Sequence, residues 1–202
     1  MNKEHYLTIK RYILDIETKP QESLVEVCKN NIKVPKTYKD EEKIQAYIEE
    51  KVKELKKKMS VDTDYADIIC IGLKELGQEP KLISNKELEE LFKKDIVLIT
   101  YNGKGFDIPL LIKYGIKNNL DLPYKRLREM TKRYSELWHI DLMEVIGDYG
   151  AYKSLDELLQ IYLGISKKPI DFEIATEKEI KEHCLEDLVN TELLYNKFNK
   201  II

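Results

Sequence analysis

A chain of 202 residues is long enough for one domain of mixed structure with a sizeable core. Hydrophobic residues make up 43% of the chain and charged residues 35%, which is typical of a soluble globular protein with a heavily charged surface. The net charge of -3 argues against a protein that coats nucleic acid electrostatically, since such proteins are usually strongly basic. It leaves open an enzyme that acts on nucleic acid.

The expected location is the cytoplasm. No apolar run approaches the roughly 20 residues that cross a bilayer, and the opening residues MNKEHYLTIKRY lack the apolar core of a signal peptide. The cysteines Cys28, Cys70 and Cys184 lie far apart without a CxxC pair, which favours three reduced thiols. We expect no association with membranes. We also expect a monomer or a weak oligomer, because no segment stands out as an oligomer interface.

The first predicted elements are a strand and a long helix. Residues 6–17 are rich in β-branched and aromatic side chains and predict a strand that ends at Pro20. Residues 39–59 predict an amphipathic helix, and we assign about 21–60 to a helical insertion after this strand. Apolar side chains recur along the helix at near-helical spacing: Ile44, Tyr47, Ile48, Val52, Leu55 and Met59. Packing on the sheet and a lysine-bearing flap that narrows substrate access are both open interpretations.

The rest of the chain alternates strands with helices. Apolar runs predict four more strands at residues 68–75, 81–84, 95–103 and 136–142. Helical spacing begins after residue 105. Two further helices close the chain, each with a capping box, Ser154 with Glu157 and Thr176 with Glu179. This order predicts a single α/β domain over residues 1–202, with a central mixed sheet flanked by helices.

The sharpest chemical feature is the pair of carboxylates Asp15 and Glu17 at the end of the first predicted strand. Residues two apart on a strand project from the same face, so both side chains point the same way. Adjacent carboxylates repel each other unless a cation lies between them, and oxygen ligands suit Mg²⁺ or Mn²⁺. A surface strand also produces this triplet without any metal, so the pair alone leaves both interpretations open.

A third carboxylate, Asp107, follows a buried strand and a glycine-bearing turn in the segment TYNGKGFDIPLL. A carboxylate in the first turn of a helix is favourable through its charge alone. The neighbouring Asn102, Gly103 and Phe106 make a more particular pattern. The glycine permits a close backbone approach, and the phenylalanine ring could stack on a terminal base.

The last predicted helix carries His183 and Asp187, which are four residues apart and therefore on one face. A histidine and an aspartate at this spacing are often an incidental pair. In the same chain as the two preceding carboxylate motifs, they indicate a third part of one site.

The segments LDIET, YNGKGFD and HxxxD resemble, in this order, the three motifs of the DEDD superfamily of 3'-5' exonucleases. The order and the rough intervals agree from about residue 10 to about residue 195. The middle motif, with SLDELLQIYLG after it, is similar to the proofreading exonuclease domains of family B DNA polymerases and to small stand-alone predicted nucleases related to them. The resemblance implies an RNase H-like fold, with the helical insertion after the first strand.

The resemblance also implies the reaction and its residues. Asp15, Glu17, Asp107 and Asp187 would be catalytic ligands of two Mg²⁺ or Mn²⁺ ions, and His183 would handle the proton. The chain would hydrolyse phosphodiester bonds at nucleic-acid 3' ends, single-stranded DNA being favoured. It would release nucleoside 5'-monophosphates by a two-metal mechanism.

The last motif departs from both main subfamilies. One has tyrosine four residues before the final aspartate, and the other has histidine five residues before it. This chain has His183 at the tyrosine spacing and Glu182 at the other position. The role of His183 as the general base is therefore open.

Contacts with nucleic acid are expected from Thr18, Asn102, Phe106, Arg126 and Arg128. The two arginines lie within residues 124–134, where basic residues are bracketed by tyrosines, as suits contact with a single strand. A solvated helix face is the alternative. Residues 139–141 (His-Ile-Asp) alternate on a predicted strand beside Trp138, which favours a structural role over a metal site.

Two other functions remain open. One is an RNase H-like nuclease that cuts internally or acts on RNA. The other is a nucleic-acid-binding module that keeps the fold without the chemistry. The four acidic residues favour a working enzyme.

Overall fold

The computed structural model describes residues 9–147 and 151–201. The start of the predicted strand at residues 6–8 lies outside these ranges. Within them, no helix is both long and apolar enough to cross a membrane. Cys28, Cys70 and Cys184 form no disulfide in the structure. The chain divides into two compact units, one formed by Thr18–Ile68 and the other by the residues before and after that segment.

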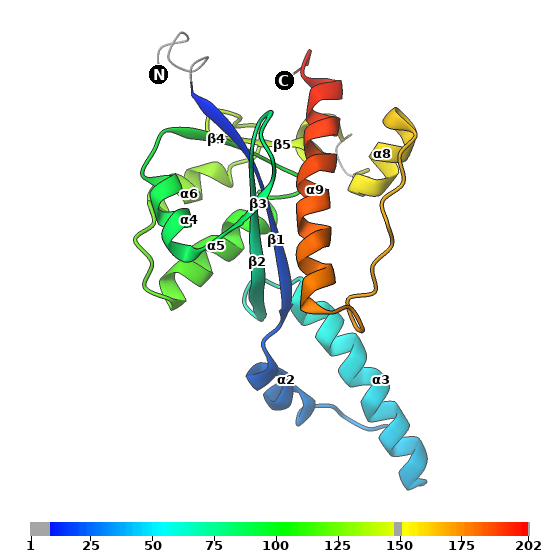
Figure 1. The fold of residues 1–202 in the computed structure, drawn as a ribbon. Helices are drawn as coiled ribbons and strands as arrows, with labels where there is room; N and C mark the ends of the chain where they lie inside the picture. The colour runs from blue at the N-terminus through cyan, green and yellow to red at the C-terminus, as the bar shows by residue number, and fades with distance from the viewer. Residues whose placement is uncertain (1–8, 148–150, 202) are drawn as a thin grey trace. The chain divides into compact units, whose positions relative to one another are not determined.

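The larger unit is built on a five-stranded sheet in the order β3-β2-β1-β4-β5 (Figure 1). Strand β1 pairs in parallel with β4, β4 pairs in parallel with β5, and β2 pairs antiparallel with β3. The N–H of Leu76 donates to the carbonyl of Arg11 at 3.1 Å, so the end of β2 lies beside the start of β1. The strands are β1 (Lys10–Pro20), β2 (Ala66–Glu75), β3 (Lys81–Ile83), β4 (Ile96–Thr100) and β5 (His139–Asp141). The expected mixed sheet is confirmed.

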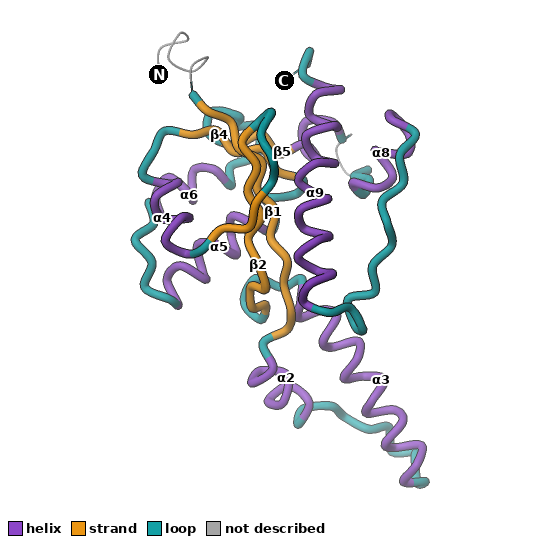
Figure 2. The backbone as a smooth tube through the Cα atoms, viewed as in Figure 1, coloured by secondary structure: helices purple, strands orange, loops and turns teal. Residues whose placement is uncertain are grey.

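Helices cover both faces of this sheet (Figure 2). On one side lie α4 (Asn85–Phe92), α5 (Asp107–Lys117) and α6 (Tyr124–Met130). On the other side lie α8 (Leu155–Leu163) and the long α9 (Glu177–Phe198), and α7 (Leu142–Ile146) follows β5 directly. The predicted capping boxes are present at Ser154 and Thr176, and Ser84 forms another.

Alternation along the strands sorts the core into two faces. Ile13 of β1 and Ile99 of β4 pack with Leu158 of α8 and with Leu188 and Leu194 of α9. All five residues of β4 are buried, as expected for a strand covered on both faces. Asp15 and Glu17 follow Ile13 by two and four positions on β1, so their side chains lie on the same face as that of Ile13. The sheet therefore presents both carboxylates on the face that α9 covers.

The smaller unit consists of α2 (Glu22–Lys29) and α3 (Glu41–Ser60) with their flanking segments. These helices occupy the predicted insertion. Val25 and Met59 are its buried apolar side chains within the helices. Lys56 pairs with Glu22 at 3.1 Å, which joins the two helices.

Candidate active site

Strand β1 and helix α9 bring the first and last motifs together. The ligand atoms of Glu17, His183 and Asp187 all lie within 4.8 Å of one another. His183 Nε2 is 3.7 Å from Asp187 Oδ2, and its ring forms a T-shaped contact with Phe172 at 5.7 Å between ring centroids. The thiol of Cys184, between the two α9 residues, donates to the carbonyl of Asp15 at 3.8 Å. Thus α9 is seated directly on the strand that carries the first two carboxylates.

Gly72 of β2 makes this close seating of α9 possible. A Cβ at this position would lie 2.7 Å from Cys184 Sγ and 2.9 Å from Leu188 Cδ1. Both distances are shorter than carbon contacts in proteins, which are roughly 3.5–4.0 Å. The two contacted residues are next to His183 and Asp187 in the chain, so a side chain at residue 72 would displace the part of α9 that carries the third motif.

Asp107 opens α5 and is only 5% exposed. Backbone hydrogen bonding at Asp107 itself and at Ile16, the residue between Asp15 and Glu17, opposes the rise of its pKa that burial causes. The Asp107 carboxylate also interacts electrostatically with Asp15. The second motif thus lies beside the first, and the structure brings together all five residues predicted to be catalytic.

The loop that leads to Asp107 is held by Asp141 at the end of β5. The Asp141 carboxylate accepts hydrogen bonds from the backbone N–H groups of Asn102 and Lys104, each at 2.9 Å, and from Met143 at 3.1 Å. The buried ammonium of Lys104 pairs with Glu144. The loop is therefore fixed in place by charged hydrogen bonds, which are stronger than neutral ones.

His139 has a structural role, as its sequence context favours. It is fully buried, its Nε2 is 2.8 Å from the Thr100 hydroxyl, and its Nδ1 is 2.9 Å from the Met130 carbonyl. Burial lowers the pKa of His139 to about 4, so the ring is neutral near pH 7.

The carboxylates of the site resist ionisation. Burial, followed by repulsion from Asp187, raises the pKa of Asp15 to about 7. Burial, followed by repulsion from Asp15 and Asp187, raises the pKa of Glu17 to about 9. Burial also raises the pKa of Asp107 well above its ordinary value. Such a cluster is costly to charge unless cations are bound within it.

The donor set fits divalent metal ions. Asp187 is 9% exposed, and its Oδ1 has no hydrogen-bond partner among the residues that the structure describes. An unpaired buried carboxylate oxygen costs free energy, so an unpaired one beside further carboxylates suits a metal ligand. Carboxylate oxygens are the ligands preferred by Mg²⁺ and Mn²⁺.

One residue of this cluster was not predicted from the sequence. Lys167, in the loop between α8 and α9, places its Nζ 2.5 Å from Asp187 Oδ2. Its charge lowers the pKa values of Asp15 and Glu17 against the larger effect of burial. The signal in the sequence is slight, since Lys167 is one of two adjacent lysines in a loop.

The residues expected to contact nucleic acid occupy varied settings. Asn102 has a left-handed backbone, with φ of 65°, and Phe106 is half-buried immediately before Asp107. Arg128 is exposed on α6. In the smaller unit, the Thr18 hydroxyl donates to the carbonyl of Ser60 at 2.5 Å.

Arg126 is engaged within the fold. Its guanidinium donates to the carbonyls of Phe92 and Lys94 and lies 3.7 Å from Asp95. It also lies 5.9 Å from the ring centroids of both Phe92 and Trp138. These contacts support a packing role, because a guanidinium with two carbonyl partners has fewer donors left for a phosphate.

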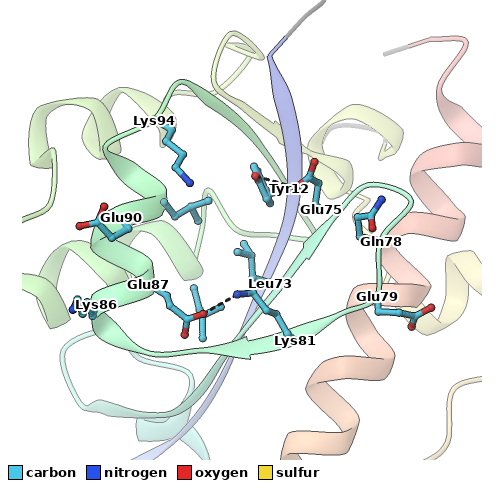
Figure 3. Close-up of a pocket in the computed structure, with 12 residues that line it drawn as sticks. Tyr12, Leu73, Glu75, Gln78, Glu79, Lys81, Lys86, Glu87, Glu90 and Lys94 are labelled. Atoms are coloured by element: carbon cyan, nitrogen blue, oxygen red, sulfur yellow. Dashed lines mark hydrogen bonds and ion pairs between the residues drawn. The ribbon is translucent and has the colours of Figure 1, made fainter.

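One surface hollow lies at the edge of the sheet, and another lies beside α9. Figure 3 shows one between β3 and α4, where Lys81 pairs with Glu87 at 2.7 Å. None of the five candidate catalytic residues, all of which are described, lines it. The other borders the site: His183 and Glu186 of α9 face Lys168 and Pro169 of the preceding loop across it.

Comparison with solved structures supports the expected fold. The structure of the family B DNA polymerase from the hyperthermophilic archaeon Pyrobaculum calidifontis matches 95% of this chain with a TM-score of 0.55 and 14% sequence identity. The match covers 24% of the polymerase chain. The sheet order and this likeness confirm the RNase H-like α/β fold.

Sequence comparison adds the family. No curated protein matches the chain. A family described as a predicted 3'-5' exonuclease related to the exonuclease domain of PolB matches residues 45–202. The matched range includes Asp107, His183 and Asp187 and begins after the first motif. The chain belongs to this family of predicted 3'-5' exonucleases related to the PolB exonuclease domain.

Proposed function

We propose that the chain is a metal-dependent 3'-5' exonuclease that removes nucleoside 5'-monophosphates from nucleic-acid 3' ends, with single-stranded DNA as the favoured substrate. The observation that carries this proposal is the buried, unpaired Oδ1 of Asp187 beside Glu17 and His183. Family membership supports the reaction class, and the single-strand preference rests on the resemblance alone.

Four carboxylates would hold the ions: Asp15, Glu17, Asp107 and Asp187. When bound, two Mg²⁺ or Mn²⁺ ions would lower the pKa of the attacking water and stabilise the negative charge on the leaving oxygen. The chain itself supplies the orientation. Strand β1 fixes two carboxylates on one face, the loop held by Asp141 fixes Asp107, and the seating of α9 on Gly72 fixes Asp187.

His183 is the proton acceptor in this proposal. Burial lowers its pKa against the opposing attraction of Asp187, so the imidazole is neutral near pH 7 and one ring nitrogen can accept a proton. The edge contact with Phe172 restricts the ring. His183 would accept the proton of the attacking water, and a neighbouring carboxylate would stabilise the resulting imidazolium.

The 3'-terminal nucleotide would contact Asn102 and Phe106, because they adjoin Asp107 on a loop fixed by Asp141. Phe106 could stack on the terminal base, since stacking accepts any base. Arg128 is exposed and available to a backbone phosphate further along the strand. Thr18 stays a proposed contact through its position after Glu17.

The test compares circular and linear single-stranded DNA with Mn²⁺ as the ion. An exonuclease degrades the linear strand and leaves the circle intact. Cleavage of the circle would show an endonuclease instead. Failure to degrade either strand, with no Mn²⁺-dependent rise in melting temperature, would show a binding module that has lost its metal site. Asp187→Asn is the matched control, because it keeps the shape of the side chain and removes its charge.

A further inference from the structure

The ammonium of Lys167 lies within the carboxylate cluster. Its Nζ is 2.5 Å from Asp187 Oδ2, and its side chain is 17% exposed although it comes from a loop. The same charge acts on Asp15 and Glu17. Lysine side chains are mostly exposed, so one that is largely covered usually has a partner. The ammonium therefore neutralises part of the negative charge that would otherwise attract a metal ion to the carboxylates.

The backbone of Lys167 is tied to α8, and its side chain extends from there to Asp187. The N–H of Lys167 donates to Asp156 Oδ1 at 2.8 Å, and the N–H of Ile165 donates to the carbonyl of Leu159 at 3.3 Å, so the loop is tied to α8. From this anchor a flexible four-carbon stem carries the ammonium to Asp187. Such a stem lets the charge move without rearrangement of the loop.

Lys167 pairs with only one of the two carboxylate oxygens of Asp187. The ammonium engages Oδ2, whereas Oδ1 of the same carboxylate is buried and has no hydrogen-bond partner among the described residues. A divalent cation bound to this carboxylate would place two positive charges close to the positively charged ammonium. Like charges a few ångströms apart repel strongly where water is scarce, so the ion and the ammonium compete for Asp187.

We propose that Lys167 is an exchangeable counterion of the active site. It pairs with Asp187 in the metal-free protein, leaves that carboxylate when a divalent ion binds, and then pairs with a phosphate of the nucleic acid. Metal binding and substrate binding are thereby coupled, since each favours the displaced position of the lysine. This inference rests on the proposed function, because it requires the carboxylates to bind metal.

The first test uses the wild-type protein. Acetylation by acetic anhydride is followed at each lysine by mass spectrometry, with and without Mn²⁺. Lys168 is exposed and is the internal reference. We expect Lys167 to be acetylated much more slowly than Lys168 without Mn²⁺ and to become more reactive when Mn²⁺ is bound. Unchanged protection of Lys167 at saturating Mn²⁺ would overturn the exchange.

The second test is a calorimetric titration of Mn²⁺ into wild type, Lys167→Met and Lys168→Met. Mn²⁺ should bind Lys167→Met about tenfold more tightly than wild type, because the variant has no charged hydrogen bond to Asp187 that the ion must break. Lys168→Met should bind as wild type does. Equal or weaker binding by Lys167→Met overturns the inference and leaves the metal site standing. Absence of Mn²⁺ binding in all three proteins overturns the proposed function as well.

Discussion

Replacement of Gly72 by alanine tests whether the contact between β2 and α9 sets the active site. The added methyl group would lie 2.7 Å from Cys184 Sγ and 2.9 Å from Leu188 Cδ1. An ordinary contact distance is about 3.5–4.0 Å, so the facing atoms must separate by roughly 1 Å. The residues pushed away are neighbours of His183 and Asp187 on α9.

This overlap affects both stability and rate. Overpacking of a well-filled core costs about 1–3 kcal/mol, and each kcal/mol lowers the melting temperature of a chain of this length by roughly 2–4 °C. A displacement of about 1 Å in a catalytic group can lower the rate about 100-fold. We therefore expect a modest loss of stability together with a large loss of single-turnover activity.

The assay pairs thermal unfolding with single-turnover cleavage of single-stranded DNA in saturating Mn²⁺. Gly115→Ala is the matched control: its Cβ would meet Leu122 Cδ1 at 2.8 Å, toward the end of α5 remote from Asp107. It should leave activity unchanged. Cys184→Ala added to Gly72→Ala removes the shortest contact and should restore part of the activity. Wild-type activity in Gly72→Ala would refute the reasoning.

Three further predictions concern stability. Burial raises the pKa of Asp15 to about 7 and that of Glu17 to about 9, so the metal-free folded state binds protons that the unfolded chain releases. The melting temperature of the metal-free protein should therefore fall from about pH 5 to about pH 9. Asp15→Asn should flatten this decline near pH 7. Asp141→Ala removes the acceptor of three backbone N–H groups and should cost about 2–4 kcal/mol in urea unfolding, with lower activity. Glu192→Ala removes the 3.1 Å carboxylate partner of the buried Lys74 and leaves its ammonium only the carbonyl of Gln78, which should cost about 3 kcal/mol, whereas a loss below about 1 kcal/mol would contradict the pairing.

Much of the fold was predictable because its signals are local. The capping boxes at Ser154 and Thr176 and the apolar run before Asn102 depend on residues close together in the chain. The elements that differ are short. The predicted strand over 136–142 has only three strand residues, because the chain turns into α7 at Leu142.

The grouping of the site residues followed from motif order, but the interactions that hold the site did not. Asp141 acts on Asn102 and Lys104, which are 39 and 37 residues away in the chain. Lys167 meets Asp187 only because the loop after α8 returns toward α9. Such contacts depend on tertiary packing, and neither spacing nor composition indicates them.

Arg126 shows that one basic side chain in a cluster can also serve the packing of the fold. A basic cluster between tyrosines favoured contact with nucleic acid, whereas the guanidinium donates to two backbone carbonyls and stands beside Phe92 and Trp138. Arginine suits such settings because its planar group can stack and donate at once. Composition alone does not separate this use from phosphate binding.

The most direct test of the account follows the cleavage of 5'-labelled single-stranded DNA and its RNA counterpart, each with Mn²⁺, Mg²⁺ or EDTA. Wild type should shorten the strand stepwise from its 3' end only when metal is present. Asp15→Asn and Asp187→Asn should lower the rate by orders of magnitude while they keep the fold. A ladder that persists in EDTA, or in both variants, would contradict catalysis by the carboxylate cluster.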